Sequence, residues 1–244
     1  MDNFLDNNLS IVISNTSINK YYNEVYISNE LSDKHLTGYQ TYVFPLFIYP
    51  IGERKELFNS KTNKTSNINW TNLPIEYQKI RSAEAVFYYI YAILYSNIYR
   101  QKYQEFLKID FPKIPFTKNI ELFKSISSIG ENLSNLHLLK TPELNNPTSK
   151  FIGQGDNVVK EIKYTDERLY INSEQYFTPV ASNIYNYYIG GYKVLNKWLK
   201  DRKSRTLSLE EVRRFCQVIT SLKLTIEIQE RIDKFYPEVE KILM

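Results

Sequence analysis

The sequence predicts an α+β fold with a mixed, β-rich N-terminal part, a helical middle, a β-hairpin and C-terminal helices. Short runs of β-branched and aromatic residues, separated by Asn, Ser and Thr, occupy residues 1–72. Longer stretches with apolar residues at helical spacing follow at 74–139 and 190–236, on either side of a loop and hairpin at 140–175. Because the chain has 244 residues and no internal repeat, we interpret 1–244 as a single domain.

Three runs in the N-terminal part are predicted strands. Residues 9–13 and 24–28 are short β-like runs, and residues 41–50 (TYVFPLFIYP) give a strong strand signal. Pro45 cannot donate to a β-ladder, so this last segment is expected to be an edge strand or to break at that point. The polar stretch 59–72 is expected to be a loop.

A helical stretch is predicted from Pro74 to about Leu107, and Pro112 and Pro115 end it because neither fits a helix interior. One face is apolar, formed by Val86, Ile90, Ile93, Leu94 and Ile98. Beside it runs a stripe of tyrosines at intervals of three and four: Tyr88, Tyr91, Tyr95, Tyr99 and Tyr103. The stripe is either the boundary of a core or a stacking surface for bases or for a partner.

The C-terminal half alternates helices with loop and hairpin. Residues 120–139 are predicted to form a helix, and the Pro, Asn and Gly residues of 140–157 predict a loop. Residues 158–164 and 168–172 flank Thr165-Asp166-Glu167 and predict a β-hairpin.

Two helices are predicted near the C-terminus. Gly190-Gly191 precedes a short one, from Tyr192 to about Asp201. Ser208 is the expected N-cap of the last helix, and Glu210 and Glu211 in its first turn suit the helix dipole. That helix is expected to run to about Phe235 and to end before Pro237.

Charge is concentrated in one segment of the chain. The formal net charge is +4, yet residues 190–214 hold eight Lys and Arg against three Asp and Glu. Residues 97–118 are also basic, with five positive and two negative side chains. A local basic focus on a near-neutral body is typical of a nucleic-acid contact face, and also of a solvated loop and helix end.

Composition excludes several protein classes. One cysteine excludes an internal disulfide, and His35, His137 and Cys216 match no zinc spacing, so we expect no metal site. The N-terminus is polar and acidic, and the longest apolar run, 86–95, is about half the length of a membrane span. We therefore expect a cytoplasmic protein with no membrane partner.

Motifs for catalysis are missing from the sequence. There is no P-loop, no glycine-rich methyl-donor turn and no Gly-x-Ser-x-Gly elbow. Asp156, Glu161 and Lys163 match the metal-binding pattern of many nucleases, but that pattern is short and degenerate. His137 and Cys216 are expected to be packed side chains. The sequence thus favours a binding module with no catalytic residues and no cofactor in this chain.

An ordered series of motifs carries a family resemblance. It begins with YYIYAILYS at 88–96 and YQEFLKIDFPKIP at 103–115, and continues with Gly130, Leu133 and LHLL at 136–139. It ends with IN at 171–172, QYF at 175–177, IGGYKVL at 189–195 and KWLKDRKSR at 197–205. The set resembles the C-terminal specificity (target recognition) domain of type ISP restriction–modification enzymes and of related type IIG-like and helicase–methyltransferase fusion proteins. In that family glycine usually stands at the position of Ser204, and glutamine at that of Lys193.

The resemblance implies sequence-specific recognition of double-stranded DNA, while a methyltransferase region flips and methylates an adenine. The implied phosphate contacts come from one basic cluster: Lys193, Lys197, Lys200, Arg202, Lys203 and Arg205. Base-reading side chains are expected in the loops 59–72 and 145–157. Gly190-Gly191 either lets the backbone approach DNA or forms a simple turn.

Two other functions stay open at this point. The chain is either the recognition module or a docking domain that packs on the methyltransferase, helicase and nuclease regions of a parent enzyme or of a neighbouring subunit, with the stripe of 86–103 as the interface. The second alternative is a small Mg²⁺-dependent nuclease. An excised domain, a truncated gene and a separately encoded subunit all fit the resemblance.

Overall fold

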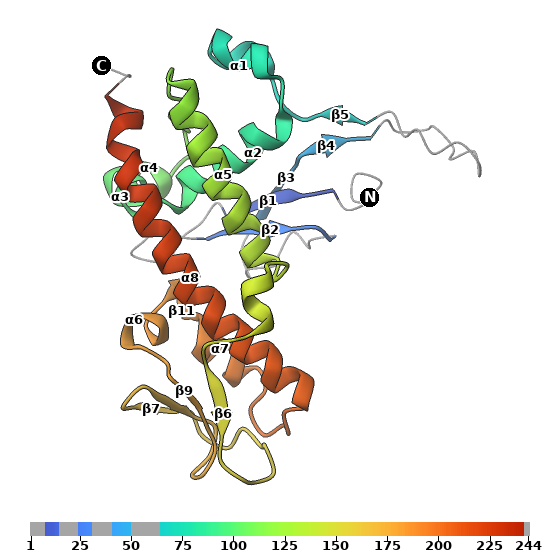
Figure 1. Cartoon of the computed structure of the whole chain (residues 1–244), viewed down its shortest axis with the longest axis vertical. Coiled ribbons are helices and arrows are strands. Elements are labelled where there is room, and N and C mark those ends of the chain that lie inside the picture. Colours follow the sequence, from blue (N-terminus) through green and yellow to red (C-terminus); the bar gives the residue numbers. More distant parts are fainter. Residues whose placement is uncertain (1–7, 15–23, 31–40, 50–63, 242–244) are drawn as a thin grey trace, which may run out of the picture. The chain divides into compact units, whose positions relative to one another are not determined.

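The computed structural model describes residues 8–14, 24–30, 41–49 and 64–241 (Figure 1). The chain divides into two compact units, the first made of residues 1–134 and 229–244, the second of residues 135–228. Helices and antiparallel sheets occur in both, so the predicted α+β class is confirmed. The single-domain interpretation stays a prediction, because two compact units can belong to one domain.

The predicted strands of the first unit are confirmed. β1 (Ser10–Ser14) is the central strand of an antiparallel sheet, between β2 (Val25–Ser28) and β3 (Thr41–Pro45). In the described part of this sheet, β3 is an edge strand and stops at Pro45, as expected from proline.

The chain resumes after Leu46 as β4 (Phe47–Ile48), which pairs with β5 (Thr65–Ser66). β5 and the 3-10 helix η2 (Trp70–Asn72) lie in the stretch predicted as a loop, of which residues 59–63 are outside the described residues. β5 has only two residues and is defined by its pairing with β4, so the local sequence does not predict it as a strand.

The helical stretch predicted from Pro74 to Leu107 is not continuous. It contains α1 (Ile75–Ile80), α2 (Ala83–Tyr95), α3 (Asn97–Lys102) and α4 (Gln104–Leu107). Two serines make the first two of the three breaks, because each side chain accepts a hydrogen bond from an amide of the next helix. Ser82 Oγ accepts from Ala85 N at 3.1 Å, and Ser96 Oγ accepts from Tyr99 N at 3.2 Å.

The tyrosine stripe belongs to the core of the first unit. Tyr91, Tyr95 and Tyr99 are buried, while Tyr88 and Tyr103 are half-buried. Burial raises the pKa of Tyr95 and Tyr99, whose hydroxyls donate to Val25 O at 2.8 Å and to Lys113 O at 3.1 Å. The rings at the centre of the stripe are therefore not available for stacking on bases.

The second predicted helix is α5 (Ile120–His137), which begins at the predicted residue and stops two residues early. Asn119 Oδ1 caps its N-terminus by accepting from Glu121 N at 3.0 Å and Leu122 N at 3.2 Å. Leu139 has a left-handed φ of 55°, and Lys140 N donates to Asn135 O at 2.9 Å, which ends the helix.

A four-stranded antiparallel sheet organises the second unit. Its order is β6 (Lys150–Ile152), β9 (Tyr176–Thr178), β8 (Arg168–Tyr170) and β7 (Lys163–Thr165). The predicted hairpin is confirmed as β7 and β8, with Asp166 and Glu167 in its turn, although its first strand begins at Lys163 rather than at residue 158 and includes Thr165. The prediction of 140–157 as loop missed β6 and the 3-10 helix η3 (Pro142–Asn145), since three-residue strands depend on a distant partner.

Short elements follow the sheet: α6 (Ser182–Tyr185), the hairpin of β10 (Tyr188–Ile189) and β11 (Tyr192–Lys193), and α7 (Val194–Lys200). The helix predicted from Tyr192 begins at Val194, because Tyr192 and Lys193 pair with β10. Gly190-Gly191 forms the turn of this hairpin, and Gly190 is buried.

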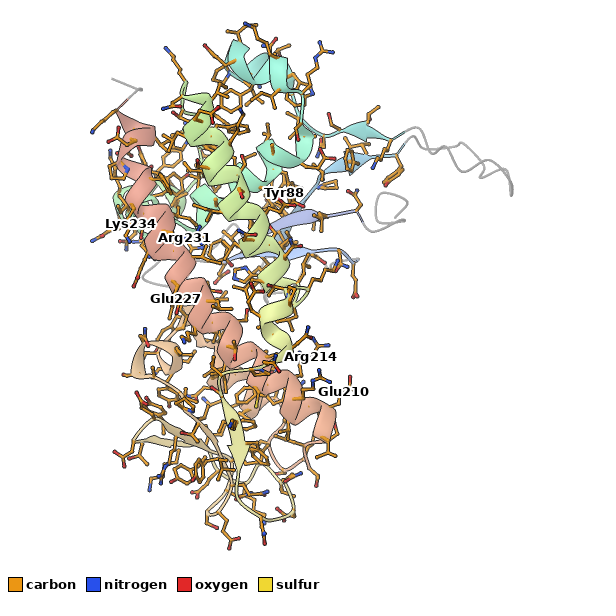
Figure 2. The ribbon with its side chains drawn as sticks, viewed as in Figure 1. Tyr88, Glu210, Arg214, Glu227, Arg231 and Lys234 are labelled. Carbon is orange, nitrogen blue, oxygen red and sulfur yellow. The ribbon has the colours of Figure 1, made fainter. Side chains whose placement is uncertain are left out.

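The last helix, α8 (Leu209–Glu240), begins as predicted. Ser208 Oγ accepts from Glu211 N at 3.1 Å and Glu211 Oε2 accepts from Ser208 N at 3.0 Å, which is a capping box. Its solvent side is charged and carries Glu210, Arg214, Glu227, Arg231 and Lys234 (Figure 2).

The predicted end of this helix before Pro237 is wrong. α8 continues for one more turn because tertiary contacts hold that turn in place. Tyr236 and Val239 are buried, and the carboxylate of Glu240 accepts from Lys102 Nζ at 2.6 Å and Tyr103 Oη at 3.2 Å. These contacts offset the hydrogen bond that proline cannot make.

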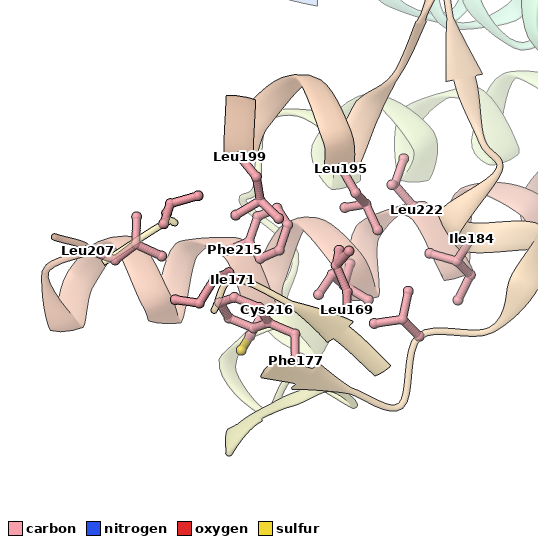
Figure 3. Close-up of a cluster of buried hydrophobic side chains, with 13 residues drawn as sticks. Leu169, Ile171, Phe177, Ile184, Leu195, Leu199, Leu207, Phe215, Cys216 and Leu222 are labelled. Atoms are coloured by element: carbon pink, nitrogen blue, oxygen red, sulfur yellow. The ribbon is translucent and has the colours of Figure 1, made fainter. Parts of the chain in front are cut away.

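The core of the second unit lies between the sheet and α7 and α8 (Figure 3). Leu169 and Phe177 enter it from the sheet, Leu195 and Leu199 from α7, and Phe215 from α8. Among the described residues, no helix combines the length and apolar content needed to cross a membrane.

Gly130 on α5 provides a test of the first unit's packing. A Cβ at this position would lie 2.0 Å from Tyr88 O of α2, well inside contact distance. We expect Gly130→Ala to lower the free energy of unfolding by about 1–3 kcal/mol, because the helices must move apart. Urea denaturation measures this change. Ser128→Ala, at an exposed position of the same helix, is the control, and equal stability of the two variants would contradict the close approach.

Candidate nucleic-acid interface

The second unit carries the net charge of the whole chain. Residues 135–228 hold fourteen Lys and Arg against ten Asp and Glu, so the formal charge of +4 falls in this unit. The six cations predicted from the sequence to contact phosphates all lie in it.

Arg202 connects the turn between α7 and α8 to both helices, through Trp198 of α7 and Glu211 of α8. Its guanidinium lies 3.6 Å from the centre of the Trp198 ring, and Nη1 donates to Trp198 O at 3.1 Å. Nε donates to Glu211 Oε1 at 3.2 Å, and Glu211 is also the capping-box residue of α8. Arg202 is half-buried, so contact with a phosphate would cost it several of these interactions.

Three more of the predicted cations have partners within the unit. Lys193 Nζ donates to Asn186 Oδ1 at 2.6 Å, Lys197 forms an ion pair with Asp201 at 2.5 Å, and Arg205 contacts Glu211 at 3.3 Å. Exposed ion pairs of this kind contribute about 0–1 kcal/mol, so Lys197 and Arg205 can exchange them for a phosphate at little cost.

Lys200 and Lys203 differ from the other four. Both are exposed, and neither side-chain ammonium forms a hydrogen bond or ion pair with the part of the chain that the structure describes. Of the predicted cluster, these two lysines are the most available to an external anion.

The loop after β6 is held at both ends and presents the side-chain amide of Gln154 at its tip. Gly153 has a φ of 104°, and a Cβ there would lie 2.3 Å from Glu174 O. Gln175 accepts from Asn157 N at 2.9 Å and donates to Asn157 Oδ1 at 2.7 Å, which fixes the far end of the loop. Gln154, between the two ends, is exposed. This arrangement suits a side chain that reads base edges.

The structure also places three cations that the sequence prediction did not single out. Lys150, Lys163 and Arg168 lie on β6, β7 and β8, and all three side chains are exposed. The signal in the sequence is the alternation of each strand, in which a buried or half-buried apolar or aromatic residue follows the cation.

The nuclease pattern does not gather its residues as metal ligands. Asp156 pairs with Lys160 at 2.8 Å, which lowers the pKa of its carboxyl. No cluster of three His, Cys, Asp or Glu side chains able to hold a metal ion occurs in the described ranges. His137 contacts Thr225 Oγ1 at 2.9 Å, and burial raises the pKa of Cys216 to about 11, so both are packed as expected.

The comparison with protein families gives a match over most of the chain. A family described as the Type ISP C-terminal specificity domain matches residues 1–230. The chain belongs to this family. The comparison with curated proteins finds no match.

Three solved structures share the fold. The first is the ATP-dependent Type ISP restriction–modification enzyme LlaBIII bound to DNA, with a TM-score of 0.70 and 22% identity. The second is a nuclease-deletion mutant of the Type ISP enzyme LlaGI in complex with a DNA substrate mimic, with a TM-score of 0.64 and 25% identity. The third is the DrdV–DNA complex, with a TM-score of 0.68 and 18% identity.

The likeness covers nearly all of this chain and a small part of each enzyme. It covers 93%, 92% and 94% of the chain, against 16%, 21% and 25% of LlaBIII, LlaGI and DrdV. The specificity domain thus corresponds to a fraction of a much larger polypeptide in each case.

One departure from the family pattern has a structural explanation. Ser204, the position at which the resemblance leads us to expect glycine, has a φ of 63°, in the left-handed region. Glycine adopts that conformation without the steric cost that a Cβ brings. The Cβ of Ser204 therefore carries a steric cost at this turn.

The carboxylate of Glu211 is expected to contribute to the free energy of unfolding through its contacts with Ser208, Arg202 and Arg205. The Ser208 amide, assisted by Arg202 and Arg205, holds the pKa of Glu211 below its ordinary value of 4.5. A depressed carboxyl pKa stabilises the fold above the unfolded-state pKa, and this contribution is lost as pH falls through the folded-state pKa. We expect Glu211→Gln to lower the free energy of unfolding by about 0.5–1 kcal/mol at neutral pH.

Chemical denaturation over a range of pH measures this contribution. The difference between Glu211→Gln and wild type should shrink as pH falls from 4.5 through the lower folded-state pKa, because below that pKa the carboxyl is protonated in both states of the wild type. Glu210→Gln, exposed in the same turn, serves as the control. A difference that stayed constant down to low pH would contradict an ionic role for Glu211.

Proposed function

We propose that this specificity domain recognises a specific sequence of double-stranded DNA for a restriction–modification enzyme and has no catalytic role of its own. The observation that carries the proposal is the family match over residues 1–230, on a chain whose net positive charge lies in one unit. Three of the solved structures that share its fold are each described with DNA.

In this proposal, phosphate contacts and base contacts come from different parts of the second unit. Lys200 and Lys203 contact phosphates and set the register of the domain on the duplex, which carries no sequence information. Lys193, Lys197, Arg202 and Arg205 support that surface, and Lys197 and Arg205 can join it. Gln154 reads a base edge, because a glutamine amide can bind adenine through two hydrogen bonds.

The proposal assigns the remaining steps to the parent enzyme, in the cytoplasm. Its methyltransferase region flips and methylates an adenine in the site that the specificity domain selects. Its helicase and nuclease regions, or those of a neighbouring subunit, are the protein partners of this chain. No cofactor or metal ion is assigned to the chain itself.

The docking alternative has less support from the structure. It relied on the apolar and tyrosine stripe of 86–103 as an interface, and Tyr91, Ile93 and Tyr95 are buried within the first unit. A docking surface would have to lie elsewhere. The nuclease alternative lacks a gathered set of ligands, since Asp156 is engaged by Lys160.

The proposal predicts salt-dependent binding to duplex DNA. Each phosphate contact releases counterions, so the logarithm of the association constant should fall linearly with the logarithm of salt concentration. Lys200→Gln with Lys203→Gln should reduce the slope by about 2 and weaken binding to all sequences alike. Fluorescence anisotropy with the full chain measures both quantities. If the wild-type chain bound no duplex at low salt, the proposed function would be wrong.

A second prediction concerns base reading. Gln154→Ala should leave non-specific affinity within about twofold, because phosphate contacts are intact, and should relax preference at one base position by about 1–3 kcal/mol. Selection of bound duplexes from a randomised pool, followed by sequencing, measures the preference. Thr148→Ala, exposed in the same predicted loop, is the control. An unchanged preference in the Gln154 variant would assign base reading to another side chain.

A further inference from the structure

The outward face of the four-stranded sheet has a regular composition that follows from its register. Lys150 lies opposite Thr178, and Ile152 opposite Tyr176, where β6 meets β9. Tyr176 is in turn opposite Tyr170 of β8, which is opposite Lys163 of β7, and Arg168 lies opposite Thr165. Eight residues therefore share one face: Lys150, Ile152, Lys163, Thr165, Arg168, Tyr170, Tyr176 and Thr178.

The opposite face of the same strands is buried in the core. Leu169 and Phe177 are fully buried, and Phe151 and Tyr164 pack against the same cluster. α7 and α8 cover that face, and the outward face takes no part in the core of the second unit. Lys150, Lys163, Arg168 and Ile152 are exposed.

The outward face is positive. It holds three cations and no carboxylate among its eight residues. The acidic residues nearest in the sequence lie in turns and connections rather than in the strands: Glu161, Asp166, Glu167 and Glu174. Of these, Asp166 lies close to the face, since Thr165 Oγ1 donates to its Oδ2 at 3.3 Å. A polyanion lying across the strands would thus meet three cations, with one carboxylate at the turn between β7 and β8.

The chain that carries Lys203 runs along the edge of this sheet. Ser204 N donates to Val159 O at 2.8 Å, Val159 N donates to Arg205 O at 3.0 Å, and Thr206 bridges to Val158. Lys160 N in turn donates to Ile171 O at 2.7 Å, next to β8. These bonds hold the segment that carries Lys203 beside the connection that leads from β6 into β7.

We infer that this outward sheet face binds the sugar–phosphate backbone of double-stranded DNA, through Lys150, Lys163 and Arg168. The inference rests on the proposed function and assigns it a surface that the basic cluster of 193–205 does not include. Strands lie about 4.8 Å apart, so Lys150 on β6 and Arg168 on β8, two strands away, are about 10 Å apart at the backbone. At a rise of about 3.4 Å, this spacing covers about three nucleotides of one strand.

The aromatic contacts favour backbone binding over base stacking. The rings of Tyr170 and Tyr176 pack on each other, with centroids 4.9 Å apart, and the Arg168 guanidinium lies 5.1 Å from the centroid of Tyr176. Neighbouring side chains thus cover the ring faces that bases would stack on. The hydroxyls of the tyrosines and of Thr178 can donate to phosphate oxygens, while the Thr165 hydroxyl already donates to Asp166 Oδ2 at 3.3 Å.

The test compares two double variants of the full chain in binding to a labelled mixed-sequence duplex of about 30 base pairs, chosen because phosphate binding is independent of sequence. Lys163→Gln with Arg168→Gln removes two cations from the sheet face. Lys140→Gln with Lys223→Gln removes the same charge from exposed positions outside the sheet. Circular dichroism melting confirms that each variant is folded, and Lys150→Gln provides a milder third variant.

The inference predicts that the sheet-face variant binds about tenfold or more weakly and loses about 2 from its salt slope, while the control stays within about twofold. If the wild-type chain binds and the sheet-face variant keeps the wild-type affinity and slope, the inference is overturned and the proposed function stands. If affinity falls equally in the control, the effect is one of net charge and the sheet face is again excluded. If the wild-type chain binds no duplex, the proposed function fails together with the inference.

Discussion

A line of contacting side chains, called the stack below although two of its rings meet edge-on, holds the second unit together, and the surfaces of the unit depend on it. The ring of Phe177 on β9 lies 4.6 Å from that of Phe215 on α8, which lies 4.5 Å from Trp198 on α7. The guanidinium of Arg202 covers the outer side of Trp198 at 3.6 Å. Large aromatic side chains dominate the energetics of such cores, so this stack sets which face of the sheet is buried and which is free.

The stack also divides the basic residues of the unit into two kinds. Arg202 is a structural cation, since it closes the stack and pairs with Glu211 at the start of α8. In the first unit, cations of the basic segment 97–118 are also engaged within the chain. Arg100 Nε donates to Leu94 O at 2.5 Å, and Lys102 pairs with Glu240. The number of Lys and Arg residues in a basic segment is therefore larger than the number whose side chains are free to contact an external anion. The available cations lie on the sheet face and on the turn after α7.

Features fixed by neighbouring residues could be predicted from the sequence, and features fixed by distant partners could not. The Ser208 cap, the hairpin turn at Asp166-Glu167 and the break at Pro45 follow from local chemistry, and all are confirmed. β6 escaped prediction because β9 defines it, and α8 passes Pro237 because buried contacts hold its last turn. In the candidate site, six cations close together in sequence were easy to notice, although the Asp201 and Glu211 partners that engage some of them stand equally close. Lys150, Lys163 and Arg168 come from three separate strands, and only the register of the sheet brings them to one face.

Lysine footprinting tests the central claim that this sheet face contacts DNA. The full chain is acetylated under limiting reagent with and without saturating duplex, and modification of each lysine is measured by mass spectrometry. The account predicts that DNA protects Lys150 and Lys163 on the face and Lys203 at its edge, while Lys140 and Lys223 are modified to the same extent in both samples. Equal modification of Lys150 and Lys163 with and without bound duplex would contradict it.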